Sequence, residues 1–173
     1  MQSLDKKAFY ASATAKLLTQ INTFALPETD KKKAVHFTTL FREAFKYDEI
    51  KQYVFMTHDK KLWDLGYDSA GFCRIASIVF AIVMGINDWK LMYIDENSWD
   101  VKMDHHYLKH IPSGKFFDMT YDQFIIDGYH KEIPYDLGHT AAFGLQPNDM
   151  SIRFAKALGI DIFKLLKNTT NGK

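Results

Sequence analysis

The chain has 173 residues, of which 47% are hydrophobic and 25% are charged, as expected for one globular domain with a sizeable core. Its 22 basic and 21 acidic side chains leave a net charge of +1, so it lacks the basic excess with which nucleic-acid-binding proteins neutralise phosphates. It begins with no apolar block of signal-peptide length, and no apolar run is long enough to span a membrane. We therefore expect a cytoplasmic protein without nucleic-acid or membrane partners, with secretion as an effector and the oligomeric state left open.

The first third of the chain has the spacing of amphipathic helices. Apolar residues recur at steps of three and four in residues 9–21, and Pro27 ends that pattern. A second helix is predicted over residues 31–47, with Asp30 as its N-cap. Residues 1–65 are therefore expected to form a helical part.

A glycine-containing turn then leads into the most apolar helix of the sequence, which is expected to end at Gly85. Cys73, the single cysteine, falls in the first turn of this helix, where backbone N–H groups and the helix dipole favour a thiolate. A single cysteine excludes an internal disulfide and a cysteine-based zinc site. The alternative interpretation is that Cys73 is a small residue packed in the core.

Beyond this helix the sequence becomes rich in aromatic residues and has the pattern of short strands. Three strands are predicted between turn residues, in residues 89–95, 101–111 and 115–124. An irregular segment follows, and a final helix is predicted over residues 149–167 with Gly159 as its weak point. Helices, then an antiparallel sheet, then a helix predict a single α+β domain.

The predicted hairpin carries histidines on one strand and an aspartate on the other. Residues 112–114 (Pro-Ser-Gly) fit a three-residue loop, a type I turn followed by a left-handed glycine. This loop sets Leu108 opposite Asp118. Because side chains alternate along a strand, His106 then shares the face of Asp118 and His105 lies on the other face. A loop one residue longer or shorter reverses this assignment.

These residue types predict nucleophilic catalysis. A cysteine nucleophile needs a base within hydrogen-bonding reach, and the base needs a group that orients it. We expect Cys73 to be the nucleophile, His106 the base and Asp118 the orienting acid, with His105 as the alternative base. We expect neither a metal nor another cofactor.

A metal site is a competing interpretation of the same hairpin. Asp104, His106 and His110 stand at alternate positions of one strand, as ligands on a common face would. No fourth ligand is obvious, although His130 or His139 could supply one.

Two stretches resemble the papain-like and transglutaminase-like superfamily of cysteine enzymes, in particular its small bacterial members. They are "GFCRIAS" at the head of the apolar helix and "HHYLKHIPSGKFFDMTYDQF", and the resemblance covers residues 66–124. The superfamily's hairpin ends in Asp-x-Thr-x-x-Gln-Phe, which "DMTYDQF" matches. An ungapped alignment places the superfamily's histidine on His106, and one inserted residue moves it to His105. The resemblance implies a papain-like α+β domain in which residues 66–127 form the cysteine helix and the hairpin, and residues 128–173 form a loop and a C-terminal helix.

The resemblance also implies an activity. It suggests a cysteine hydrolase or acyltransferase of the peptidase, deamidase or transglutaminase type, with Cys73 attacking an amide or thioester carbonyl of a protein or peptide substrate. Papain has a glutamine shortly before its cysteine, whereas this chain has Tyr67 and Asp68 there. The oxyanion would then be stabilised by the Cys73 backbone N–H, with support from Tyr67 or Gln123. The alternative is a catalytically inactive binding or effector module of the same fold, with Cys73 packed and inert.

Overall fold

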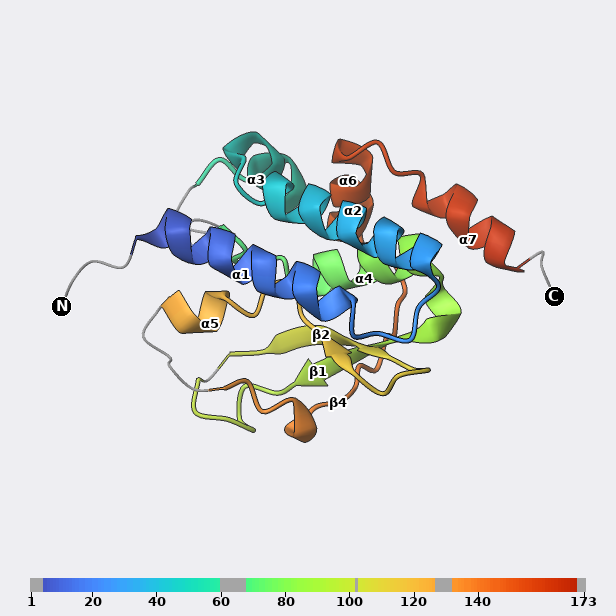
Figure 1. The fold of residues 1–173 in the computed structure, drawn as a ribbon. Coiled ribbons are helices and arrows are strands. Elements are labelled where there is room, and N and C mark those ends of the chain that lie inside the picture. The colour runs from blue at the N-terminus through green and yellow to red at the C-terminus, as the bar shows by residue number, and fades with distance from the viewer. Residues whose placement is uncertain (1–4, 60–67, 102, 127–131, 171–173) are drawn as a thin grey trace.

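A layer of helices covers one face of a small antiparallel sheet in the computed structural model (Figure 1). The structure describes residues 5–59, 68–101, 103–126 and 132–170. The helices are α1 (Lys6–Ile21), α2 (Glu28–Ala44), α3 (Asp48–Phe55), α4 (Cys73–Met84), α5 (Gln123–Ile126), α6 (Asp149–Ala157) and α7 (Ile162–Thr170). The strands are β1 (Trp89–Ile94), β2 (His105–His110), β3 (Phe116–Phe117) and β4 (His139–Thr140), and 3₁₀ turns lie at Ile86–Asp88 and Tyr135–Leu137. The predicted α+β class is confirmed.

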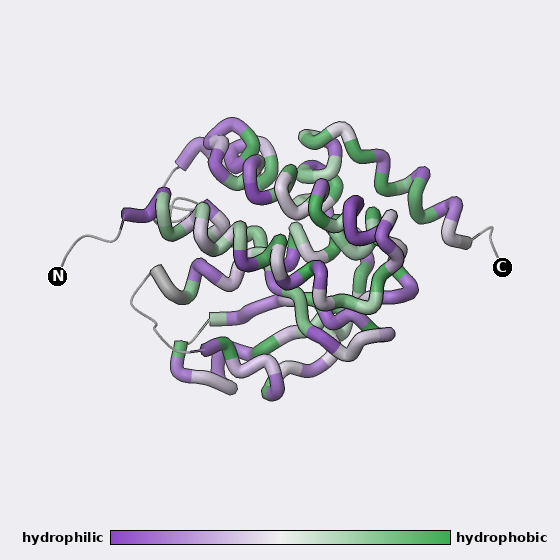
Figure 2. The backbone as a smooth tube through the Cα atoms, viewed as in Figure 1, coloured by the Kyte–Doolittle hydropathy of each residue, from purple (hydrophilic) through white to green (hydrophobic). Residues whose placement is uncertain are grey.

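Helix α4 lies at the centre of the molecule. Every residue from Ile75 to Met84 is buried, because α4 contacts β1 and β2 as well as α2, α6 and α7. Figure 2 shows this helix as a largely apolar stretch, whereas polar and apolar residues alternate along the outer helix α7. Helix α4 begins at Cys73 and ends before Gly85, whose φ of 107° stops the helix, as the sequence predicted. Among the described residues, no helix has both the length and the apolar character needed to cross a membrane.

The sheet has the strand order β3-β2-β1-β4, and all its pairs are antiparallel. Leu108 stands opposite Phe117, not opposite Asp118 as predicted. The reason is the hairpin loop, which has four residues instead of three. His110 and Lys115 close it, with the His110 N–H donating to the Lys115 carbonyl at 2.8 Å. The left-handed glycine at position 114 is confirmed, with φ 69°.

Other boundaries also differ from those predicted. Helix α2 begins three residues early, at Glu28, so that Asp30 lies in its first turn and is not its N-cap. The predicted C-terminal helix is divided into α6 and α7 near Gly159, which has φ 70°. The predicted strand 115–124 is reduced to β3, because the Asp118 side chain accepts the backbone N–H of Thr120 and turns the chain away from the ladder.

Candidate active site

Cys73 is the first residue of α4, and its side chain is half-buried. Its thiol lies within hydrogen-bonding reach of the imidazoles of both His105 and His106. Burial raises the pKa of the thiol, but the hydrogen bonds and positive charges of the two imidazoles outweigh it and lower the pKa to about 6. The cysteine is therefore mostly a thiolate at neutral pH.

His105 is fully buried and is held by Asp118. Its Nε2 lies 2.5 Å from Asp118 Oδ2, and both side chains are enclosed. Burial lowers the pKa of His105, but the charge and hydrogen bond of Asp118, together with Cys73, raise it to about 9. Nε2 is engaged by the carboxylate, and Nδ1 lies 3.3 Å from the Gln123 side-chain amide. Between about pH 6 and about pH 9 Cys73 and His105 form a thiolate–imidazolium pair.

The prediction that Asp118 orients His106 was wrong. Because Leu108 stands opposite Phe117, the residue after Phe117, Asp118, comes level with Tyr107. Tyr107 and His105 lie on the same face of β2, so Asp118 reaches the face that carries His105. His106 projects from the other face and packs against the Tyr93 ring, with their centroids 5.0 Å apart. The four-residue loop therefore places Asp118 beside His105, the histidine that the sequence analysis gave as the alternative base, as the register argument required.

Asp118 is fixed by several donors in addition to the imidazole. Its Oδ1 accepts the backbone N–H of Thr120 at 3.0 Å and the Thr120 hydroxyl at 3.2 Å. Its Oδ2 accepts the hydroxyl of Tyr135 at 3.0 Å, and the carbonyl of Tyr135 accepts the Tyr107 hydroxyl at 2.7 Å. The sequence placed Tyr135 in an irregular segment, and no pattern there distinguished it from its neighbours.

Gln123 lies beside the reactive pair. Its Nε2 is 3.3 Å from His105 Nδ1 and 3.3 Å from the Thr120 hydroxyl, and the side chain is buried. Gln123 therefore lies beside the His105 ring; the oxyanion-supporting role expected for it stays a prediction. The other predicted donor, Tyr67, lies outside the described residues.

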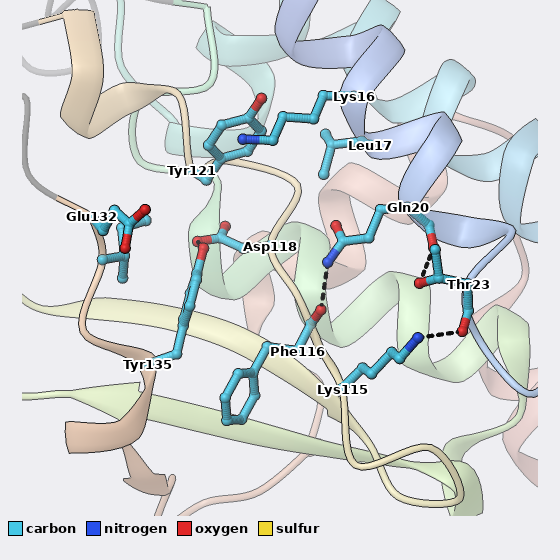
Figure 3. Close-up of a pocket in the computed structure, with 11 residues that line it drawn as sticks. Lys16, Leu17, Gln20, Thr23, Lys115, Phe116, Asp118, Tyr121, Glu132 and Tyr135 are labelled. Carbon is cyan, nitrogen blue, oxygen red and sulfur yellow. Dashed lines mark hydrogen bonds between the residues drawn. The ribbon is translucent and has the colours of Figure 1, made fainter.

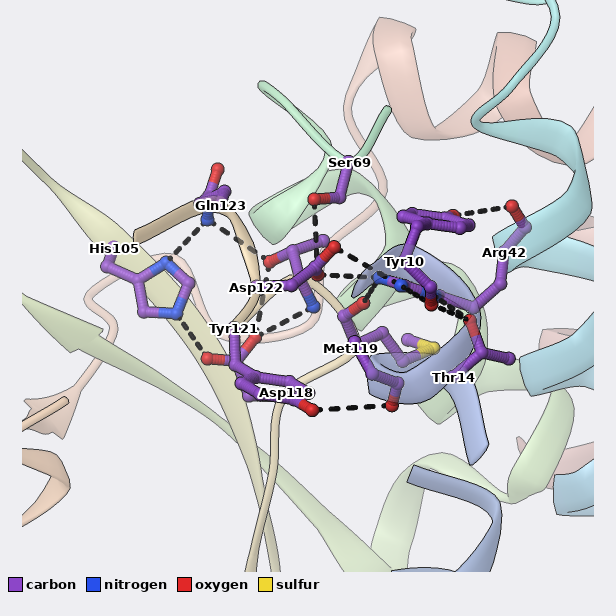
Figure 4. Close-up of polar contacts among 12 residues, drawn as sticks. Tyr10, Thr14, Arg42, Ser69, His105, Asp118, Met119, Tyr121, Asp122 and Gln123 are labelled. Carbon is purple, nitrogen blue, oxygen red and sulfur yellow. Dashed lines mark hydrogen bonds and ion pairs between the residues drawn. The ribbon is translucent and has the colours of Figure 1, made fainter. Parts of the chain in front are cut away.

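A buried ion pair joins α2 to the segment after β3, and the loop before the cysteine contacts it through Ser69 (Figure 4). Arg42 of α2 contacts Asp122 through two hydrogen bonds, of 2.6 and 3.2 Å, and Ser69 donates to the same carboxylate at 3.3 Å. The guanidinium also donates to the carbonyls of Met119 at 2.9 Å and Tyr10 at 3.2 Å. The sequence offers one signal of this buried pair, an arginine inside the apolar stripe of a predicted helix, and the sequence interpretation missed it.

The third histidine of the hairpin is not part of this cluster. His110 Nδ1 lies 2.8 Å from the Ser113 hydroxyl, and its ring packs against Phe24 and Trp89. Burial lowers its pKa, which favours the neutral ring. His110 therefore stabilises the hairpin loop and the core edge.

The competing metal site is not assembled. Asp104 accepts a tyrosine hydroxyl at 2.6 Å, and His110 is enclosed by aromatic rings. Among the described residues, no three histidine, cysteine or acidic side chains are grouped so that they could hold a metal ion. One suggested fourth ligand, His130, lies outside the described residues.

A cavity of about 710 Å³ opens on the other side of Asp118, between α1, β3 and the segment that carries Tyr135 (Figure 3). Its wall includes the carboxylate, the Tyr135 ring and the amino groups of Lys16 and Lys115. Neither Cys73 nor the histidines are among its lining residues. The cavity thus adjoins the orienting acid and not the thiol.

The described residues bring together a thiol of lowered pKa, an imidazole of raised pKa and a carboxylate, an arrangement suited to nucleophilic attack on a carbonyl carbon. Cys73 is the first residue of α4, and the Gln123 amide lies 3.3 Å from His105 Nδ1. Comparisons of the chain with protein-family models, with curated proteins and with solved structures gave no match.

Proposed function

We propose that the protein is a cysteine hydrolase or acyltransferase of papain-like or transglutaminase-like type, acting on an amide or thioester of a protein or peptide. The observation that carries the proposal is the buried hydrogen bond between His105 Nε2 and Asp118 Oδ2, on an imidazole that also interacts with Cys73. A cysteine that only fills core space needs neither a charged base nor a carboxylate that orients it.

The first half of the reaction forms an acyl-enzyme. The Cys73 thiolate attacks the carbonyl carbon, and the carbonyl π electrons move to the oxygen to give a tetrahedral oxyanion. As the oxyanion collapses, the carbon–nitrogen or carbon–sulfur bond of the substrate breaks. His105 gives its Nδ1 proton to the departing amine or thiolate, and Cys73 is left as a thioester.

The second half releases the acyl group. The neutral His105 takes a proton from water, or from an acceptor amine, as that nucleophile attacks the thioester carbon. The carbon–sulfur bond breaks, and the thiolate and imidazolium are restored. Asp118 keeps its charge throughout, since its part is to hold the ring tautomer and stabilise the imidazolium.

The oxyanion has two donors within the described residues. The Cys73 backbone N–H is one of the unpaired N–H groups at the start of α4 and points along the favourable end of the helix dipole. The Gln123 side-chain amide lies 3.3 Å from His105 Nδ1. We assign the oxyanion to this pair, with Gln123 taking the role that a glutamine before the cysteine has in papain.

His105 is the base in this proposal because it has the carboxylate partner. His106 also contacts the thiol, yet it packs against Tyr93, and no hydrogen bond from its ring to a carboxylate is present among the described residues. His106 therefore adds a second imidazole beside the sulfur, but no carboxylate among the described residues orients its ring.

Alkylation kinetics test the proposal. Iodoacetamide should modify the native protein once, at Cys73, and much faster at pH 7 than it modifies the urea-unfolded chain. The intact mass of Cys73→Ala should not change after the same treatment. His105→Ala should slow the reaction at least tenfold at pH 6–7, whereas His106→Ala should slow it less. The variant His58→Ala, at an exposed histidine of another segment, is the matched control. Equal rates for the native and unfolded chains would favour the inactive binding module instead.

A further inference from the structure

Arg74 follows the candidate nucleophile directly and lies in the first turn of α4. Its side chain is half-buried, and its Nε is shielded from solvent without a hydrogen-bond partner among the described residues. No ion pair to its guanidinium is formed within the described part of the chain. A charged donor that loses water without gaining a partner is costly, so its retention needs an explanation.

The other two arginines of the chain show what a satisfied guanidinium looks like here. Arg42 makes a two-fold contact with a buried carboxylate, and Arg153 donates its Nε to the Val54 carbonyl at 2.9 Å. Arg74 instead has its Cζ 6.0 Å from the ring centre of Phe143. That ring is 70% exposed, so it flanks the guanidinium without closing it off from solvent.

Contacts on the sheet side connect the same region to the thiol. His106 contacts Cys73 and packs on Tyr93, whose ring lies 5.2 Å from that of the exposed His139. His139 begins β4, and the chain runs from β4 through a turn to Phe143. One short segment therefore contacts the arginine through Phe143 and, through His139, the Tyr93 ring on which His106 packs.

We propose that Arg74 binds an anionic group of the acyl substrate, an aspartate or glutamate side chain or a terminal carboxylate close to the carbonyl that Cys73 attacks. The proposal rests on the proposed function, because it assumes that the thiol is the reacting atom. A planar guanidinium with free N–H groups forms paired hydrogen bonds to a carboxylate, and the Phe143 ring beside it would shield that contact from water. The substrate class is thus an acidic peptide or an acyl group with a carboxylate.

Two alkylating reagents of nearly equal size separate this proposal from the proposed function. Iodoacetamide is neutral and reports only on the thiolate, whereas iodoacetate carries the carboxylate that Arg74 should bind. The measurement is the ratio of the second-order rate constants, iodoacetate over iodoacetamide, at pH 7 and low salt. Arg74→Gln should lower this ratio about tenfold, and Arg74→Lys should lower it less, because lysine keeps the charge but not the paired geometry.

Lys164→Gln, at an exposed position of α7, is the control for a general loss of positive charge and should leave the ratio unchanged. Fast iodoacetamide labelling with the same ratio in Arg74→Gln and in the wild type would overturn the role of Arg74 and leave the proposed function intact. Slow iodoacetamide labelling of the wild type would overturn both. A ratio that falls equally in Lys164→Gln would also refute the proposal, since it would show a long-range effect of net charge.

Discussion

Replacement of Asp118 with asparagine tests the reactive cluster most directly. The substitution keeps the size of the side chain but removes the negative charge that holds the pKa of His105 at about 9. Burial, which lowers the pKa of the His105 ring, is then no longer opposed by the Asp118 charge and favours the neutral form. The thiol loses the imidazolium that stabilised its anion, and its pKa should move from about 6 towards the ordinary value of about 8.5.

The size of the effect follows from these values. At pH 6 about half of the wild-type thiol is ionised, against roughly 0.3% of a thiol with a pKa of about 8.5, a difference of about 150-fold. A more basic thiolate is also intrinsically more nucleophilic, by roughly tenfold over this interval. The net rate of alkylation at pH 6 should therefore fall about tenfold or more.

The pH at which the alkylation rate constant rises, the acid limb of the pH–rate profile, is a better measurement than the rate at one pH, because a change in intrinsic nucleophilicity does not move it. We would measure iodoacetamide rate constants from pH 5 to pH 10 for the wild type, for Asp118→Asn and for Asp136→Asn, which removes an exposed carboxylate from the segment that carries Tyr135. The limb should shift upward by about two pH units in Asp118→Asn alone. If it stays near pH 6, the carboxylate does not set the charge of His105 and the triad assignment fails.

Three further predictions concern the residues that support the site. Tyr135→Phe removes a hydrogen-bond donor from Asp118 Oδ2, the oxygen that contacts the imidazole, so the carboxylate should attract the imidazolium more strongly. The pKa of His105, read from the high-pH side of the same alkylation profile, should then rise by roughly half a unit. Asp122→Ala leaves a guanidinium buried without its partner and should lower the free energy of unfolding by about 3–5 kcal/mol in urea titrations, whereas Glu43→Ala, at an exposed ion pair, should change it by less than about 1 kcal/mol. Gly138→Ala would place a Cβ 1.8 Å from the Tyr107 hydroxyl oxygen, so it should destabilise the chain by about 1–3 kcal/mol, and Tyr107→Phe in the same chain should recover part of that loss.

The helical framework could largely be predicted from the sequence, because it depends on local periodicity and on residues that stop helices. The apolar run after Cys73 is long enough for a buried helix, and Gly85 ends it where the sequence indicated. The division of the last helix at Gly159 was foreseen only as a weak point. The short β3 was not foreseen, because an aspartate that hydrogen-bonds to its own backbone competes locally with strand pairing.

The choice between His105 and His106 as the partner of Asp118 shows how one residue of loop length changes a predicted site. The sequence correctly placed a left-handed glycine at position 114, but it could not show which pair closes the loop. Ile111 belongs to the loop because its N–H donates to the Asp88 carbonyl, a contact with a distant segment. Since side chains alternate, that single extra residue moved Asp118 from the face of His106 to the face of His105.

The supporting contacts could not be predicted, because they join positions that no local pattern relates. Arg42 and Asp122 stand 80 positions apart, and Tyr135 reaches Asp118 from an irregular segment. An arginine in a helix and a tyrosine in a loop are both ordinary surface residues by composition. The fold brings Tyr135 to Asp118 and Arg42 to the adjacent Met119 carbonyl, contacts that become visible only in three dimensions.

The buried ion pair also has a consequence for the order in which the protein becomes reactive. Arg42 comes from the helical first third, Ser69 from the turn before α4 and Asp122 from the segment after the hairpin, so the pair closes only when distant parts of the chain have met. Contacts of such long sequence separation form late, because loop closure costs entropy before the contact repays it. A chain with its helices formed but the hairpin undocked would hold an ordinary thiol. In a refolding experiment, fast alkylation of Cys73 should therefore accompany the slowest phase and report the completion of the fold.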